Sequence, residues 1–114
     1  MADSMDPASL LPLQPAVFQI LVALAGEDAH GYAIMQDVAA RTGTKLGPGT
    51  LYTTMPRLLE QGLVTELRQR PAADKDDPRR RYYSLTPFGR AVARAEAARL
   101  AGLLAHARER GLAL

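Results

Sequence analysis

The chain has 114 residues, 47% of them apolar, with no Cys, no Trp and a formal net charge of +2. This fits one domain with a modest aliphatic core, and the lack of Cys excludes disulfides, thiolate metal sites and Cys nucleophiles. Because no apolar run reaches the roughly 18 to 20 residues of a membrane span, and the N-terminus lacks the basic start of a secretory signal, we expect a soluble, cytoplasmic protein.

The charge is divided unevenly along the chain. Residues 1–40 hold five acids and no Lys or Arg (−5), whereas residues 41–114 hold all 14 basic residues against seven acids (+7). This asymmetry favours a surface that faces a polyanion. An ordinary solvated surface is the alternative that the composition leaves open.

Two short helices are predicted after a flexible N-terminal arm, residues 1–13, which shows no periodicity. Apolar residues repeat at helical spacing over residues 14–25 and again over residues 31–41. Pro15 suits the first turn of the earlier helix, and Gly43 suits the end of the later one. The leucines of the arm can pack on a partner, so that part of the arm becomes ordered.

A third helix is predicted over residues 47–62, with Pro48 in its first turn and Gly62 at its end. One apolar stripe follows the helical repeat and consists of Leu51, Met55, Leu58 and Leu59. The opposite face is short and polar and consists of Thr50, Thr53, Thr54, Arg57, Glu60 and Gln61. Such a face suits either solvent or a DNA major groove.

A β-hairpin with a long polar tip is predicted next. Residues 63–69 and 80–86 are rich in β-branched or aromatic side chains that roughly alternate, and the turn-rich residues 70–79 separate them. Three helices followed by a hairpin, the wing, predict a winged helix-turn-helix over residues 14–86. Basic side chains that can neutralise DNA phosphates flank or occupy the tip, and they are Arg68, Arg70, Lys75, Arg79, Arg80 and Arg81. Arg81 can alternatively pair with an acid inside the hairpin.

The last predicted helix covers about residues 87–110, after a capping Thr86. At 1.5 Å per residue it is roughly 36 Å long, which exceeds what a domain of this size needs for itself. One apolar stripe can pack on the chain's own core and the other on a second copy, so residues 87–114 are predicted to be a dimerisation helix. The candidate interface residues are Phe88, Val92, Leu100, Leu103, Leu104 and Ala107. The alternative is that this helix folds back on the first helix of the same chain.

Four sequence motifs, in the same order along the chain, resemble those of a known protein family. They are His-Gly-Tyr-Ala-Ile (residues 30–34), Gly-Thr-Leu-Tyr (49–52), Leu-Leu-Glu-Gln-Gly-Leu-Val (58–64) and Arg-Arg-Arg-Tyr-Tyr-Ser-Leu-Thr-Pro-Phe-Gly (79–89). With these motifs the chain resembles the PadR family of winged-helix transcriptional regulators over about residues 13–108. The resemblance implies a mainly α fold with a small β-hairpin. It also implies a homodimeric DNA-binding repressor that responds to small aromatic or cationic compounds.

By this likeness, the helix of residues 49–61 reads the major groove, and the basic wing of residues 68–81 contacts phosphates or the minor groove. Tyr32 and Tyr52 would touch or orient the phosphate backbone. The candidate DNA-binding residues are Tyr32, Lys45, Thr50, Tyr52, Thr53, Thr54, Arg57, Arg68, Lys75, Arg79, Arg80 and Arg81. Arg57 can read guanine or contact a phosphate, and Tyr32 can instead be a core aromatic.

Pro56 departs from the family pattern because it stands inside the proposed recognition helix. An interior Pro removes a backbone hydrogen bond at a cost of about 3 kcal/mol. The helix must therefore kink near residues 52–53 or begin late enough to tolerate Pro56. His30 and His106 are too few for a metal site, and His30 suits the cap of the second helix.

Three functional hypotheses follow. The first is a homodimeric regulator, a repressor, that binds a pseudo-palindromic double-stranded DNA operator and is released by a small-molecule effector. The second, favoured by Pro56 and the small net charge, is a winged-helix module for protein interaction or dimerisation without specific DNA binding. The third is a ligand sensor with a mainly aliphatic dimer cleft. No enzyme or cofactor is expected, because no Ser-His-Asp arrangement stands in a recognisable frame and residues 47–49 lack the Lys of a nucleotide loop.

Overall fold

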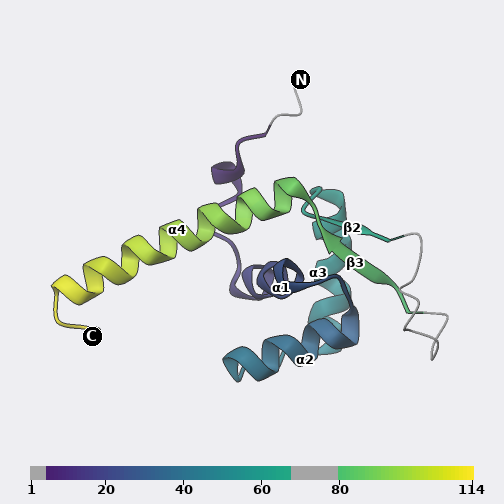
Figure 1. The fold of residues 1–114 in the computed structure, drawn as a ribbon, viewed down its shortest axis with the longest axis horizontal. Coiled ribbons are helices and arrows are strands. Elements are labelled where there is room, and N and C mark those ends of the chain that lie inside the picture. The colour runs from purple at the N-terminus through teal and green to yellow at the C-terminus, as the bar shows by residue number, and fades with distance from the viewer. Residues whose placement is uncertain (1–4, 68–79) are drawn as a thin grey trace.

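Helices α1 to α4 and a small antiparallel sheet make up the computed structural model, which describes residues 5–67 and 80–114 (Figure 1). The elements in chain order are the 3-10 helix η1 (Pro7–Leu10), α1 (Pro15–Gly26), β1 (Ala29–His30), α2 (Gly31–Thr42), α3 (Pro48–Glu60), β2 (Val64–Glu66), β3 (Tyr82–Leu85) and α4 (Pro87–Glu109). In the sheet, β3 lies between β1 and β2, and both pairs are antiparallel. This arrangement is a winged helix-turn-helix with a long C-terminal helix, as the sequence predicted.

Aliphatic side chains from the first three helices meet in the core. The fully buried members include Ile20, Leu21, Ile34, Val38, Leu51 and Leu58. In α3, the predicted stripe is buried through Leu51, Met55 and Leu58, while Leu59 is half buried. Because these residues recur every three or four positions, one face of each helix supplies the core and the other remains outside.

Glycines end α2 and α3 as predicted. Gly43 and Gly62 have φ of 73° and 76°, the left-handed conformation that closes a helix. After α3, the N–H groups of Gly62 and Leu63 donate to the carbonyls of Leu59 and Leu58, at 3.1 and 3.0 Å. This closure directs the chain from α3 straight into β2 and so places the hairpin beside the helix.

Helix α3 runs without interruption from Pro48 through Pro56 to Glu60. Of the two alternatives for Pro56, a late start of the helix is therefore ruled out. Because proline has no N–H, the carbonyl of Tyr52 lacks its usual donor four residues later. The side chain of Pro56 itself is exposed.

The sheet differs from the predicted hairpin in two ways. Strand β1 was not predicted, and it pairs with β3 so that Ala29 faces Tyr83 and His30 faces Tyr82. The strands β2 and β3 are shorter than the predicted segments, and residues 68–79, which include the tip, lie outside the described residues.

The N-terminal arm is more regular than its lack of periodicity suggested. Asp6 caps η1 by accepting the N–H of Ala8 at 3.0 Å, and the leucines that follow pack against the core. The N–H of Leu13 then donates to Oε2 of Glu96 in α4, at 3.3 Å. The arm is thus attached to α4, which contacts both η1 and α1 (Figure 1).

Helix α4 packs on the protein through its first half, and its second half extends beyond the other elements (Figure 1). Val92 is fully buried and Phe88 packs against the core, so these two predicted interface residues face the chain's own interior. Leu100, Leu103 and Leu104 remain 37%, 55% and 43% exposed. Among the described residues, no helix has both the length and the apolar character that crossing a bilayer requires.

Candidate nucleic-acid interface

The outward face of α3 carries the polar side chains that the sequence singled out. Thr50, Thr53 and Arg57 are exposed, and Thr54 is half buried at the edge of this face. Lys45 is exposed in the connection that precedes the helix. The face is therefore open to a partner along the whole length of α3.

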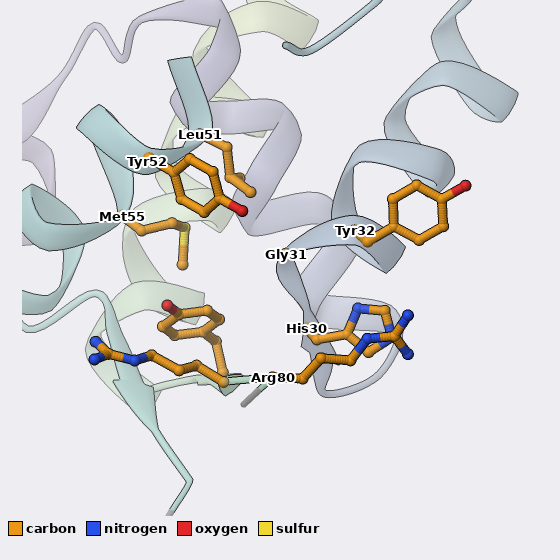
Figure 2. A pocket seen from close by; sticks show the side chains of 9 residues that line it. His30, Gly31, Tyr32, Leu51, Tyr52, Met55 and Arg80 are labelled. Atoms are coloured by element: carbon orange, nitrogen blue, oxygen red, sulfur yellow. The ribbon is translucent and has the colours of Figure 1, made fainter. Parts of the chain in front are cut away.

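A hollow of about 390 Å³ lies between the N-terminus of α2, α3 and the start of β3 (Figure 2). Its lining consists of His30, Gly31, Tyr32, Leu51, Tyr52, Met55, Arg80, Arg81 and Tyr83. Tyr32 and Tyr52 stand on opposite sides of it and are 56% and 72% exposed. The fold thus brings four predicted DNA-binding residues, two tyrosines and two arginines, to one hollow.

Gly31 lies at the back of the hollow, where α2 approaches α3. A Cβ atom at this position would lie 2.8 Å from Cδ2 of Leu51, closer than carbon atoms tolerate. The glycine of the His-Gly-Tyr motif therefore permits the close approach of the two helices, and this approach brings Tyr32 to the rim opposite Tyr52.

His30 joins the cap of α2 to the sheet. Its Nδ1 accepts the N–H of Ala33 at 3.1 Å, which confirms the predicted capping role. Nε2 of the same ring lies 3.2 Å from Nη1 of Arg80 at the rim of the hollow. The ring also packs edge-to-face on Tyr82, with centroids 5.2 Å apart. The sequence indicated the cap but not these contacts with β3.

At the start of β3, Nη1 of Arg81 lies 3.9 Å from Oε1 of Glu66 on β2, the pairing that the sequence offered as an alternative role. The neighbouring tyrosines point to opposite sides of the strand, with Tyr82 buried and Tyr83 half buried. Burial raises the pKa of the Tyr83 hydroxyl, Glu66 adds to this effect and Arg81 opposes it. Tyr83 therefore lines the hollow as a neutral phenol that can donate a hydrogen bond.

Four predicted basic residues of the wing, Arg68, Arg70, Lys75 and Arg79, lie outside the described residues. Within residues 5–67 and 80–114, no group of three or more His, Cys, Asp or Glu side chains is placed to hold a metal ion. The described part of this surface presents hydroxyl, phenol and guanidinium groups. These groups bind anions and base edges.

A three-helix core whose third helix exposes a polar face beside a basic hairpin defines the winged-helix class of DNA-binding proteins. Within this class, the model of the transcriptional regulator PadR-like family matches residues 20–95. The chain belongs to this family of transcriptional regulators.

Two relatives match at the level of sequence. The chain is 42% identical over 86 residues to an uncharacterized 37.1 kDa protein in transposon TN4556 of Streptomyces fradiae, across 73% of this chain and 23% of that protein. It is 40% identical over 73 residues to transcriptional regulator Rv3488 of Mycobacterium tuberculosis, across 64% of each. The matched region therefore spans less than two thirds of the length of either relative.

Solved structures share the fold. A PadR family transcription regulator from Clostridium difficile R20291 superimposes with a TM-score of 0.73 at 22% identity, over 84% of this chain and 97% of that one. A complex structure of hsRosR-S4 superimposes with a TM-score of 0.68 at 28% identity, over 92% and 89% of the two chains. These structures support the winged-helix architecture together with the long last helix.

Proposed function

We propose that the protein is a homodimeric transcriptional repressor that binds a pseudo-palindromic DNA operator and is released from it by a small effector. The observation that carries this proposal is the hollow shared by α2, α3 and β3, which groups tyrosines and arginines beside the polar face of α3. In each copy, α3 enters the major groove and the arginines of the hairpin contact flanking phosphates.

The free half of α4 supports the homodimer. Its exposed leucines need an apolar partner, and a shallow hollow of about 170 Å³ between α1 and α4 offers one. The apolar part of that hollow consists of Phe18, Val22, Ala25, Leu85, Ala93 and Ala97. Leucines from a second copy can cover it, and the resulting two-fold axis relates two α3 helices to two half-sites about 34 Å apart.

We place the effector in this hollow between α1 and α4, at the contact between the two copies. Because the chain has no Trp, the walls of that hollow are mainly aliphatic and lack large flat surfaces for stacking. A compact apolar compound fits this lining better than a large planar one. Its binding would change how the two copies pack and hence the spacing of the two α3 helices.

Gel-shift titration on the DNA upstream of the protein's own coding region, repeated over a range of salt concentrations, tests the proposal. We expect specific retention that weakens as salt rises. Arg81→Ala should lower affinity for all sequences alike and reduce the salt slope by about one, because one phosphate contact is lost. Arg108→Ala, the same loss of charge at the far end of α4 (Figure 1), is the matched control.

The outcomes separate the hypotheses. Failure of a dimeric protein to bind this DNA specifically would favour the protein-interaction module instead. If DNA affinity depends on salt as steeply in Arg81→Ala as in the native protein, Arg81 does not contact a phosphate. Release of bound DNA by a compound would support the effector, and a protein that is monomeric and does not bind duplexes at low salt would overturn the whole proposal.

A further inference from the structure

The outward face of α3 carries a small apolar patch that the polar pattern of its sequence concealed. We define this methyl patch as Gly49, Thr53 and Pro56, all of which are exposed. They stand at positions i, i+4 and i+7, so they follow one another along the same side of the helix. Thr50 and Arg57 stand three and four positions from Thr53, so they lie directly beside the patch on the same outward face.

Thr53 presents its methyl group rather than its hydroxyl proton. Its Oγ1 donates to the carbonyl of Gly49 at 2.8 Å, and a hydroxyl has only one proton to give. In this conformation the hydroxyl proton of Thr53 is used within the helix and is not directed toward a phosphate oxygen or a base. The methyl group and the remaining lone pairs of Oγ1 are what a partner can meet.

Neither packing in the core nor a left-handed backbone explains why Pro56 and Gly49 occur at these positions. Pro56 costs the interior of a helix about 3 kcal/mol, yet its ring is exposed and adds nothing to the core. At Gly49 an added Cβ would meet nothing within 4 Å, and the backbone there is not left-handed. A glycine in open space leaves room for another molecule to approach the helix backbone.

We propose that the methyl patch reads the 5-methyl group of a thymine in each half-site, an inference that rests on the proposed DNA-binding function. In the major groove, the thymine methyl is the one apolar feature among the base edges, and side-chain methyl groups and rings recognise it by contact. The patch has no side-chain donor to offer guanine or adenine. 5-Methylcytosine carries the same methyl group, and the test distinguishes the two bases.

The test begins with duplexes selected by the native protein from a library with a randomised core. We expect a thymine at one fixed position of each half-site. Replacing that thymine by deoxyuridine removes only the methyl group and should weaken binding roughly four-fold, the value of one buried methyl. Deoxyuridine at other positions should have no effect. At the read position, 5-methylcytosine should bind better than cytosine, because the methyl group is restored.

Three variants assign the effect to the patch. Thr53→Ser keeps the hydroxyl but lacks the methyl group, whereas Thr53→Val keeps a methyl group and lacks the hydroxyl. Pro56→Ala removes the ring and restores a backbone N–H, so it does not endanger folding. We expect Thr53→Val to retain the preference for thymine over deoxyuridine, and both Thr53→Ser and Pro56→Ala to reduce it toward unity.

Equal affinity for thymine and deoxyuridine at every position of a selected duplex would overturn this inference and leave DNA binding intact. A Thr53→Val variant that loses the preference as Thr53→Ser does would also overturn it, because the hydroxyl would then be the group that matters. Failure to select any duplex would overturn the proposed function and the inference together.

Discussion

At the scale of single residues, Glu96 is a carboxylate held inside the protein by its partners. It is 2% exposed. Oε1 accepts Nε of Arg99 at 2.7 Å, and Oε2 accepts Nη2 of Arg99 at 2.9 Å and the N–H of Leu13 at 3.3 Å. The hydrogen bonds from Arg99 outweigh the opposing effect of burial and hold the pKa of Glu96 below its usual 4.5. An ionised Glu96 therefore attaches the N-terminal arm to α4.

Glu96→Gln should lower the free energy of unfolding at pH 7 by about 1 to 3 kcal/mol, because charge-assisted bonds from two partly buried donors to a buried carboxylate are weakened. The pKa of Glu96 is lower in the folded state than in the unfolded state. The stabilisation is thus present above about pH 4.5 and is lost as pH falls through the folded pKa. Urea denaturation at several pH values should show the two proteins converging in acid.

The exposed Glu109→Gln is the matched control, since it changes the same group on the same helix. It should leave the free energy of unfolding unchanged within about 0.5 kcal/mol. A Glu96→Gln variant as stable as the native protein at pH 7 would contradict the role of this carboxylate.

The structural role of a single residue can be predicted from the sequence in some cases and not in others. The cap by His30 was predictable, because the donor it satisfies lies three positions away. Glu96 stands among alanines and arginines and has the pattern of a solvated helix residue. Its burial depends on Leu13, 83 positions earlier in the chain, and no local pattern carries that information.

At the scale of elements, the start of α4 is joined to the connection between α3 and β2. Oγ1 of Thr86 accepts the N–H of Gly89 at 2.8 Å, as the predicted cap requires, and donates to the carbonyl of Gly62 at 2.6 Å. A Cβ atom on Gly89 would lie 2.0 Å from the carbonyl oxygen of Leu63. The helix therefore contacts the backbone of the hairpin directly, and this contact fixes the hairpin relative to α4.

Gly89→Ala should lower the free energy of unfolding by about 2 kcal/mol or more, because a backbone oxygen must move to admit the methyl group. Gly102→Ala is the matched control in the same helix, where an added Cβ meets nothing within 4 Å. There the substitution should raise stability by up to about 1 kcal/mol, through helix propensity alone. Thermal or urea unfolding measures both, and shifts of the same sign would contradict the close contact.

The helices and the β2–β3 hairpin were predictable from the spacing of their apolar residues, whereas β1 was not. The helices α1 to α4 each place apolar residues at repeated helical spacing, and their bounds lie close to the predicted ones. Strand β1 has two residues, too few to show an alternation, and it exists because β3 lies beside it. The hollow at the candidate interface has the same origin, since β1 and β3 bring His30 and Arg80 together.

At the scale of the whole molecule, the second half of α4 extends beyond the other elements (Figure 1). Its leucines are spaced to form one apolar side, and nothing within the described chain covers them. In the proposed homodimer, a second copy would cover these leucines and supply the symmetry of the proposed pseudo-palindromic operator. Dimer formation and DNA affinity would then be linked, because two half-sites bind together more tightly than either alone.

Leu103→Glu should convert the proposed dimer to a monomer, because it places a charge at the centre of an apolar contact where no partner is provided. Light scattering at micromolar concentration measures the mass, and an unchanged helical signal in circular dichroism shows that each copy remains folded. Affinity for DNA should fall at least ten-fold as the two half-sites become independent. Leu112→Glu, an exposed leucine beyond the end of α4, should remain dimeric. A native protein that is monomeric under these conditions, or a Leu103→Glu variant that stays dimeric, would show that α4 does not form the interface between copies.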